Sequence, residues 1–344
     1  MSVREKPKIL VVGATGFIGA HIVRHLRERG YPVCAGRRAH SETWHLEDVD
    51  LQWVYADLEE PESIHDALED CAGVIHAAGY YPRDGLDIDT ARRRGVGQLR
   101  NLLDACIEKR VARVVFVSSP VTLGVGEGEE SVLDEDDYYV PGTVKNAYYE
   151  TKYAMEAEIY RYVRRGLPVV VTIPSAVLGP GDLNPANGHL LLRLARGKLP
   201  AIIGHAINVV DVRDTARSIV AALERGRPGR RYVLGGENTS VDGLVELISE
   251  ISSVDRPRFH LPTTAVRRLA WLAERLGRRA GFDPPPMVVG VDLIAFSRRL
   301  SSARAVNELA HHSRPLPETI ADALAWFEAH DYLQEGLIRS GRKS

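Results

Sequence analysis

Short runs of apolar residues alternate with longer amphipathic segments through the first half of the chain. The apolar runs predict strands over residues 9–12, 33–36, 51–55, 74–76, 114–118 and 169–173. The segments between them carry apolar residues three or four positions apart and predict helices over residues 17–29, 61–70, 90–109 and 146–165. Continuous apolar strands separated by helices are typical of a parallel sheet that helices cover on both faces. We therefore expect an α/β fold with a Rossmann-like, doubly wound parallel sheet.

The second half is less regular and predicts a smaller α/β lobe that binds the substrate. We expect residues 1–174 to form the dinucleotide-binding domain and residues 175–344 to form this C-terminal lobe. Strands are predicted at 208–212 and 231–234, and we expect these segments, within 206–234, to return to the sheet. Helices are predicted over residues 241–252, 263–280 and 316–329.

A glycine-rich turn joins the first predicted strand to the first predicted helix. It reads Gly13-Ala14-Thr15-Gly16-Phe17-Ile18-Gly19. Glycines at such a turn let the backbone approach a pyrophosphate closely, and the positive end of the helix dipole favours its charge. A glycine triplet alone is a weak signal, but its place directly after a strand of a βαβ pattern favours dinucleotide binding.

The end of the second predicted strand bears on the choice between NAD and NADP. NAD binders place an acidic residue about 20 positions beyond the glycines, where it binds the ribose 2′-hydroxyl. Here the strand ends in Arg37 and Arg38, with no carboxylate. Guanidinium groups match a 2′-phosphate, so we expect NADP as the preferred cofactor and NAD as the alternative.

Three residues form a candidate catalytic group. Tyr148 and Lys152 lie four positions apart near the start of a predicted helix, hence on one face. A nearby ammonium is expected to lower the pKa of the phenol, so that Tyr148 can exchange a proton with a substrate oxygen. Ser119 follows a predicted strand and can hold that oxygen. Ser118 is a plausible neighbour.

In their order along the chain, these motifs resemble the extended short-chain dehydrogenases/reductases, the NAD-dependent epimerase/dehydratase family. Asp57-Leu58 resembles the family's adenine-contacting pair, His76-Ala77-Ala78-Gly79 its fourth-strand motif, and Ile173-Pro174 the stretch after its sixth strand. The likeness covers nearly the whole length and is closest to dihydroflavonol-reductase-like proteins and to hopanoid-associated sugar epimerases. It implies that Tyr148 is the acid/base, that Lys152 tunes it and binds the nicotinamide ribose, and that Ser119 positions the carbonyl. The serine-to-glycine spacing from Ser119 to Gly124 favours Ser119 over Ser118.

One residue departs from the family pattern. Gly95-Val96-Gly97 stands where the family carries the asparagine associated with its active site. Because glycine weakens a helix, we also expect a local break there.

The surroundings of the trio favour a simple reductase. Pro120-Val121 replaces the Asp-Glu pair of the family's dehydratases, and Ile207 stands where its epimerases carry a diphosphate-binding arginine, although Arg213 or Arg193 could substitute. The loop from Gly124 to Lys145 carries seven carboxylates against one lysine, which would repel an anionic substrate. We therefore expect hydride transfer between NADP(H) and a ketone, aldehyde or alcohol of an uncharged small molecule. A nucleotide-sugar epimerase and a non-catalytic NADP-sensing regulator are the alternatives.

Composition excludes several other classes. The 344 residues are 44% hydrophobic and 26% charged with a net charge of −2, which is ordinary for a globular protein and excludes a basic nucleic-acid binder. The three cysteines lack metal or redox spacing, His311-His312 is expected at the surface, and no metal is expected. We expect a cytoplasmic protein without a signal peptide or integral membrane segment, and the resemblance implies a possible homodimer.

The segment from Val266 to Ala280 is amphipathic and basic. Val266, Leu269, Ala270, Ala273 and Leu276 share one face, with arginines around them. It is expected to pack beside the substrate pocket, and the alternative is that it rests on a membrane surface.

Overall fold

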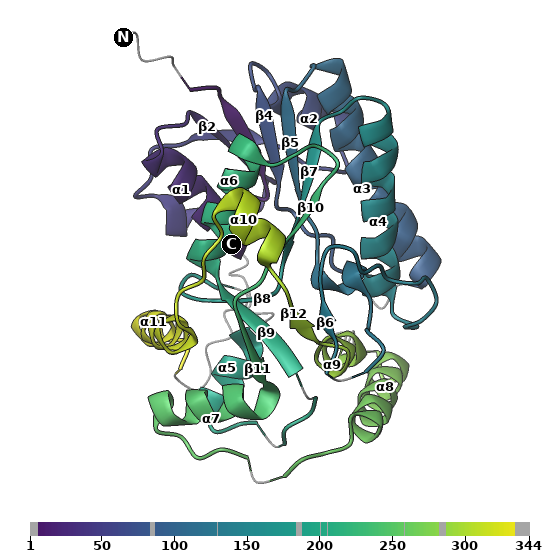
Figure 1. The fold of residues 1–344 in the computed structure, drawn as a ribbon, viewed down its shortest axis with the longest axis vertical. Helices are drawn as coiled ribbons and strands as arrows, with labels where there is room; N and C mark the ends of the chain where they lie inside the picture. The colour runs from purple at the N-terminus through teal and green to yellow at the C-terminus, as the bar shows by residue number, and fades with distance from the viewer. Residues whose placement is uncertain are drawn as a thin grey trace.

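The structure is a computed structural model that describes residues 6–82, 87–128, 130–183, 188–199, 201–204, 206–257, 259–281 and 287–333. Its centre is a seven-stranded parallel sheet in the order β10-β7-β5-β4-β1-β2-β3 (Figure 1). The strands are β1 (Ile9–Val12), β2 (Val33–Arg37), β3 (Gln52–Tyr55), β4 (Gly73–His76), β5 (Arg113–Val117), β7 (Val169–Pro174) and β10 (Arg231–Leu234). The order reverses between β1 and β4, which confirms the expected Rossmann-like, doubly wound fold.

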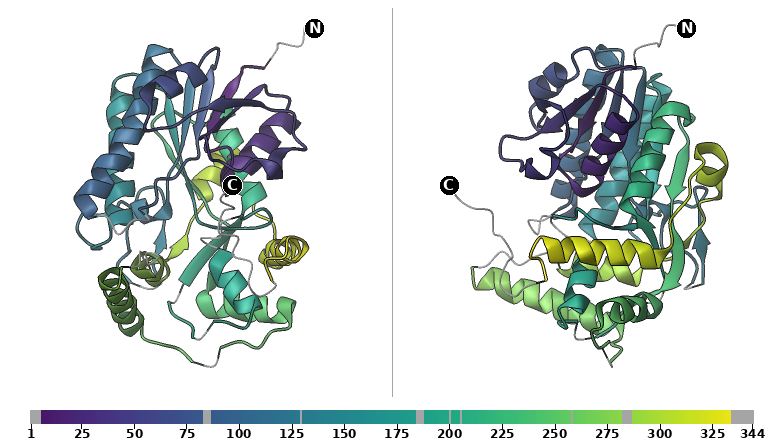
Figure 2. Two further views of the ribbon diagram at one scale, coloured as in Figure 1. Left: turned by 180° about the vertical axis from the view of Figure 1, so that it is seen from behind. Right: turned by 90° about the vertical axis from the view of Figure 1, so that its left-hand side faces the viewer.

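Helices cover both faces of this sheet (Figure 2). The helices of one face are α2 (Pro61–Ala67), α3 (Ile88–Glu108) and α4 (Ala147–Arg164), and those of the other are α1 (Phe17–Glu28) and α6 (Val212–Arg225). Along β1, Leu10 and Val12 belong to the α3–α4 core, while Ile9 and Val11 belong to the α1–α6 core. Because alternate side chains point to opposite faces, a strand buried on both sides must be apolar throughout.

The α3 helix runs without interruption through Gly95 and Gly97, so the expected local break is wrong. Gly95 is buried, and a Cβ built on it would lie 2.6 Å from Cγ2 of Thr151 and 3.2 Å from Sδ of Met155, both in α4. The missing side chain lets α3 and α4 approach closely. Packing against α4 thus outweighs the low helix propensity of glycine.

Most of the other elements gather below the large sheet, while α10 (Ala303–Leu309) lies beside α6 and β10 (Figure 1). A three-stranded sheet, in the order β11-β9-β8, consists of β8 (Ala176–Leu178), β9 (Ala206–Asp211) and β11 (Glu237–Ser240). A two-stranded pair consists of β6 (Val132–Leu133) and β12 (Arg299–Leu300). The helices of this region are α5 (Gly188–Ala195), α7 (Val241–Ser252), α8 (Thr263–Arg279), α9 (Met287–Ala295) and α11 (Leu316–Ala329).

The two segments expected to return to the large sheet behave differently. Arg231–Leu234 pairs with β7 as the edge strand of that sheet. Ala206–Asp211 pairs with β8 and β11 in the small sheet instead. The chain therefore passes between the upper and lower parts of the molecule more than once.

His311 lies inside the molecule, so its expected surface position is wrong. Its side chain is buried, with Nδ1 2.7 Å from Oγ of Ser218 and Nε2 2.6 Å from the carbonyl oxygen of Gly235. These bonds connect the end of α10 to α6 and β10. His312 is exposed.

Candidate active site

The glycine-rich turn lies at the point where the strand order reverses, between the carboxyl ends of β1 and β4. Gly13 has a φ of +84°, and a Cβ there would lie 2.6 Å from the backbone nitrogen of Ala78. A Cβ on Gly19 would lie 1.9 Å from the carbonyl oxygen of Gly13. Both positions require glycine because backbone occupies the space of a side chain.

The α1 helix begins beside this turn. Gly16 is its N-cap and supplies no side-chain cap, and its first turn, which contains Phe17 and Ile18, has no acidic residue. The amide groups at such a helix start favour an anion. The close-packed glycines, together with Thr15 in the turn, therefore fit the pyrophosphate of a dinucleotide.

The remaining cofactor candidates lie at or after the carboxyl ends of strands of the large sheet. Arg37 ends β2 and is exposed, with its guanidinium 5.7 Å from the centre of the Trp53 ring, and Arg38 follows it, also exposed. Asp57 and buried Leu58 follow β3. Four further candidates end or follow two other strands: Ala77, Ala78 and Gly79 after β4, and Pro174 at the end of β7.

Ser119 and Tyr148 meet at the carboxyl end of the sheet. The hydroxyl of Tyr148 donates a hydrogen bond of 3.1 Å to Oγ of Ser119. Ser119 follows β5, and Tyr148 lies in the first turn of α4, where the side chain of Asn146 accepts a hydrogen bond from its backbone N–H. This N-cap fixes the start of α4, and with it the position of Tyr148.

Lys152 lies one turn further along the same face of α4. Its Nζ is 5.8 Å from the centre of the Tyr148 ring, and a Cβ on Gly79 would lie 3.6 Å from that Nζ. Burial lowers the pKa of Lys152 to about 8, and the carboxylate of Glu156 opposes this shift. Lys152 therefore still carries its charge at neutral pH, close to the phenol.

Tyr148 differs from the expectation in its acidity. Burial raises the pKa of Tyr148 above its ordinary value, and the hydrogen bond to Ser119 only partly opposes this. The expectation that Lys152 brings the pKa of this phenol down toward neutrality is therefore wrong for this arrangement. Desolvation is the largest influence on the pKa of this phenol, so Tyr148 keeps its proton at neutral pH.

A buried polar network behind the trio was not foreseen. The hydroxyl of Ser118 donates to Oε2 of Glu156 at 2.5 Å, and Nε of Arg231 lies 2.8 Å from the other carboxylate oxygen. Arg231, from the edge strand β10, also donates to the carbonyl oxygens of Thr122, Glu135 and Asp137. Glu156 follows Lys152 by four residues, so helix periodicity could have revealed it. Nothing in the sequence signals Arg231, because its position depends on the sheet order.

Two aromatic residues lie beside the trio: His76, at the end of β4 and part of the fourth-strand motif, and Tyr81, which was not foreseen. The ring of Tyr81 lies against that of Tyr148, with centres 4.8 Å apart. His76, at the end of β4, is buried 5.4 Å from the ring of Phe116, and burial with the nearby charge of Lys152 lowers the pKa of His76 to about 4. His76 is therefore uncharged at neutral pH. The ring of Tyr81 packs against the ring of Tyr148.

The structure shows the surroundings of Ile207 and Arg213, two residues that bear on the charge of the substrate. Ile207 is half-buried in β9, while Arg213 lies 2.7 Å from a carboxylate oxygen of each of Asp211 and Asp322. Arg213 is thus neutralised by two acids, which disfavours it as a substitute diphosphate ligand.

The acidic loop is less free than its sequence suggested. Glu130 forms an ion pair with Arg299, and Asp136 accepts a 2.9 Å hydrogen bond from Arg304. Glu135 is buried and accepts a hydrogen bond from the backbone of Val233. Several of the seven carboxylates therefore do not face an incoming substrate, and their expected repulsion is correspondingly smaller.

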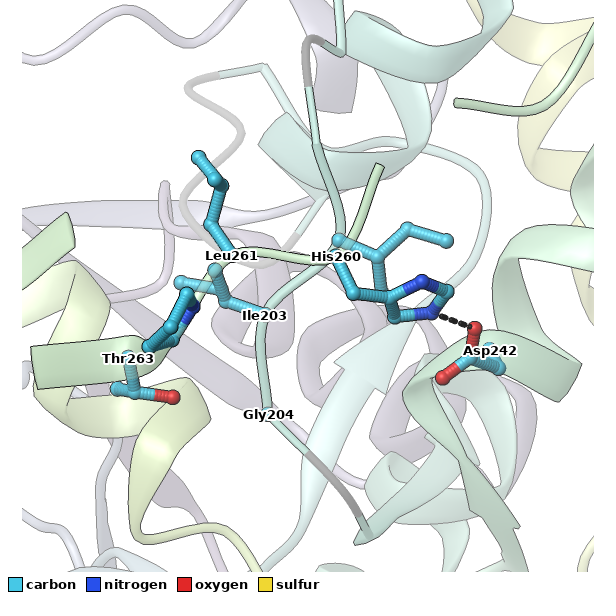
Figure 3. Close-up of a pocket in the computed structure, with 8 residues that line it drawn as sticks. Ile203, Gly204, Asp242, His260, Leu261 and Thr263 are labelled. Atoms are coloured by element: carbon cyan, nitrogen blue, oxygen red, sulfur yellow. Dashed lines mark hydrogen bonds and ion pairs between the residues drawn. The ribbon is translucent and has the colours of Figure 1, made fainter. Parts of the chain in front are cut away.

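A hollow of about 310 Å³ lies elsewhere, in the lower part of the molecule (Figure 3). It is lined by Ile202, Ile203, Gly204, Asp242, His260, Leu261, Pro262 and Thr263. None of Ser119, Tyr148 and Lys152 lines it, so it is separate from the catalytic candidates. Within the described ranges, no group of histidine, cysteine and acidic residues could hold a metal ion, and no helix is long and apolar enough to cross a bilayer.

Comparison with known proteins places this geometry in context. The sequence model of the "NAD dependent epimerase/dehydratase family" matches residues 9–235. A "Putative dihydroflavonol 4-reductase" from Synechocystis sp. is 33% identical over 332 residues, which are 94% of this chain and 95% of that protein. "Sterol demethylase protein B" from Methylococcus capsulatus is 31% identical over 92% of this chain and 97% of that protein. The crystal structure of a nucleoside-diphosphate-sugar epimerase from Pseudomonas aeruginosa superposes with a TM-score of 0.80 at 27% identity, over 95% of this chain and 99% of that one.

Proposed function

Because the chain belongs to the NAD dependent epimerase/dehydratase family, and is an NAD(P)-dependent enzyme of the extended short-chain dehydrogenase/reductase type, we propose that it reduces a carbonyl with NADPH. The reverse reaction, oxidation of the corresponding alcohol, uses the same site. The observation that carries this proposal is the 3.1 Å hydrogen bond between Tyr148 and Ser119, one helical turn from the buried Lys152.

Each of the three side chains has a distinct role in the proposed reaction. The nicotinamide, when bound, supplies or takes up a hydride. Tyr148 donates its proton to the carbonyl oxygen as that oxygen gains charge, and Ser119 holds the oxygen by a hydrogen bond. Lys152 stabilises the phenolate left on Tyr148 and binds the nicotinamide ribose. Tyr148 begins the reductive cycle protonated, as proton donation to the carbonyl oxygen requires.

The turn from Gly13 to Gly19 is assigned to the pyrophosphate, because added side chains there would collide with backbone. We assign Asp57, Leu58 and the segment Ala77–Gly79 to the adenosine and ribose side of the cofactor, with Pro174 near the nicotinamide. These assignments rest on the resemblance in sequence together with the positions at the carboxyl ends of the strands.

The proposed substrate is an uncharged small molecule. Ile207 offers no charge to a diphosphate, and Arg213 is already paired with two carboxylates. The names of the relatives from Synechocystis and Methylococcus point to flavonoid-like and sterol substrates in those proteins. The structural similarity to a nucleoside-diphosphate-sugar epimerase supports the alternative of sugar epimerisation. The retained Tyr148 and Lys152 disfavour a regulator without chemistry.

NADP is proposed over NAD because Arg37 and Arg38 end β2, where NAD binders carry a carboxylate. Arg37→Ser should weaken NADPH binding by about 10- to 100-fold, the range expected when a charged hydrogen bond is lost, and leave NADH binding unchanged. Fluorescence titration with each nucleotide measures this. An equal loss for both nucleotides would argue against the 2′-phosphate assignment.

Tyr148→Phe tests the reaction itself. A panel of uncharged ketones and aldehydes is screened with the wild-type protein by loss of NADPH absorbance, and the variant is then assayed on any substrate found. Turnover should fall by at least about 100-fold while NADPH binding is retained. Tyr153→Phe, a half-buried tyrosine of the same helix, is the matched control and should keep its activity. Unchanged turnover in Tyr148→Phe would refute the assignment.

Three broader features belong to the same proposal. We expect the division near residue 174 to separate cofactor binding from substrate binding. A cytoplasmic location and a homodimer are expected from the family resemblance. Sedimentation velocity on the purified protein measures the oligomeric state.

A further inference from the structure

The α8 helix (Thr263–Arg279) is held to the protein by two of its polar side chains. It packs against α9 at the lower edge of the molecule (Figures 1 and 2). Glu274, its one acidic residue, is buried and accepts a 2.8 Å hydrogen bond from the backbone of Val288. Arg267 lies 2.7 Å from a carboxylate oxygen of Asp292, which is completely buried. Polar contacts thus hold this helix to the protein.

The large apolar residues of α8 are exposed to solvent. Leu269, Leu272 and Leu276 are 63%, 45% and 53% exposed, and their spacing of three and four residues makes one stripe along the helix. Trp271 is 50% exposed on a neighbouring side of the helix. The sequence placed Leu269 and Leu276 on one face with Ala270, and the structure covers only part of that face, because Ala270 is buried and the two leucines are exposed.

Two more large apolar residues are exposed in the segment before the helix. Phe259 is 70% exposed and Leu261 is 44% exposed, and Leu261 also lines the hollow of Figure 3. We call this surface the α8 face and define it as Phe259, Leu261, Leu269, Trp271, Leu272 and Leu276. Large exposed apolar side chains grouped in this way mark an interaction surface.

The exposed charged residues of the α8 helix are basic, and one half-exposed carboxylate, Asp242, bonds His260 at the edge of the α8 face. Arg268, Arg275 and Arg279 are exposed, and the guanidinium of Arg275 lies 5.2 Å from the centre of the Trp271 ring. The only carboxylate of the helix, Glu274, is buried on the opposite side. The face is therefore cationic, although the whole chain has a net charge of −2.

We propose that the α8 face docks on the surface of an anionic phospholipid membrane. A leucine stripe with a tryptophan, flanked by arginines, has the chemistry that partitions into the interface between lipid headgroups and acyl chains. The arginines attract anionic headgroups within a Debye length of the membrane. A symmetric dimer through this face would bring two sets of arginines together, so charge complementarity favours the membrane over a second copy.

The α8 helix is also connected to the catalytic candidates. Asp292 of α9 contacts Arg267 through one carboxylate oxygen and accepts a 2.9 Å hydrogen bond from Asn146 through the other. Asn146 is the N-cap of α4, whose first turn carries Tyr148. A buried bridge thus fixes the docking helix relative to the site, so that docking would give the site a defined orientation toward the lipid. The docking proposal itself does not depend on the proposed reaction.

Co-sedimentation with vesicles tests the proposal. The full chain should sediment with vesicles of equal parts phosphatidylcholine and phosphatidylglycerol, much less with pure phosphatidylcholine, and less as salt is added. Trp271 fluorescence should shift to the blue on binding, and Trp271→Phe should lose most of this shift. Leu272→Gln combined with Leu276→Gln should lower binding by at least about tenfold, because two anchoring side chains become polar.

The matched control is Val306→Gln, which changes an apolar residue that is 50% exposed on α10 and should leave vesicle binding unchanged. NADPH titration of each variant shows that the fold and the cofactor site persist, and it separates loss of docking from failure of the proposed reaction. Equal sedimentation of wild type and the double glutamine variant would overturn the proposal. A concentration-dependent dimer that this variant abolishes, without vesicle binding by the wild type, would also overturn it.

Discussion

Lys152 holds an ammonium group that the fold takes almost entirely out of water. The side chain is 4% exposed, and burial brings its pKa from 10.5 to about 8. At about 1.4 kcal/mol per pH unit, keeping this group charged costs the folded chain about 3 kcal/mol. Methionine has a similar apolar stem without the charge. Lys152→Met should therefore be more stable than the wild type at pH 7 by about 3 kcal/mol.

The pH dependence of this difference has a definite sign. Between pH 8 and 10.5 the unfolded chain holds the Lys152 proton and the folded chain has lost it, so wild-type stability rises relative to that of the variant. The gap should thus be full below about pH 8 and vanish toward pH 10.5. The Glu156 carboxylate remains paired in the variant, because its hydrogen bond with Ser118 and its ion pair with Arg231 do not involve Lys152.

Urea unfolding followed by circular dichroism, at several pH values from 7 to 10, measures the gap. Taking the difference between variant and wild type cancels the titration of the other groups. Lys145→Met, at an exposed lysine close by in sequence, is the control and should change stability by less than about 0.5 kcal/mol. A variant less stable than the wild type at pH 7, or a gap that does not change with pH, would refute the reasoning.

Two further predictions concern the packing around α4. Gly95→Ala should destabilise the protein by about 1–3 kcal/mol, because the added Cβ would overpack against Thr151. Gly97→Ala has open space around it and should stabilise the protein by up to about 1 kcal/mol. Thermal unfolding compares the two variants, and stabilisation by both would contradict the packing argument. Glu156→Gln should lower the free energy of unfolding by about 3 kcal/mol, because it leaves the buried guanidinium of Arg231 without its counter-charge. Glu158→Gln, whose arginine partners are exposed, should lower it by about 1 kcal/mol or less. Urea unfolding measures both, and equal losses would argue against the buried pair.

The parts of the fold that depend on local pattern were predictable from the sequence. The central strands of the large sheet are buried and largely apolar on both faces, so their positions along the chain were visible before their neighbours were known. The glycine turn and the Tyr148–Lys152 spacing are likewise local. Their common placement at one edge follows because the carboxyl ends of parallel strands meet there.

Contacts between distant segments were not predictable. Arg231 reaches Glu156 only because β10 lies beside β7, and a strand order is not written in any short stretch of sequence. The outward turn of Leu269 was missed because hydrophobic periodicity defines an apolar face but not what covers it. The acidity of Tyr148 was misjudged because burial, which the sequence does not give, is the largest influence on the pKa of its phenol.

The strand β10 lies at the edge of the large sheet but comes late in the sequence, so it leaves the ribosome after all the other strands of that sheet. Ser119, Tyr148 and Lys152 all emerge well before Arg231, so the Glu156 carboxylate first meets the growing sheet without its partner. A chain interrupted at residue 174 would contain the whole trio but lack both the last strand of the sheet and this counter-charge. Synthesis therefore delivers the catalytic side chains early, and their surroundings reach their final state only after a much later segment returns to close the sheet.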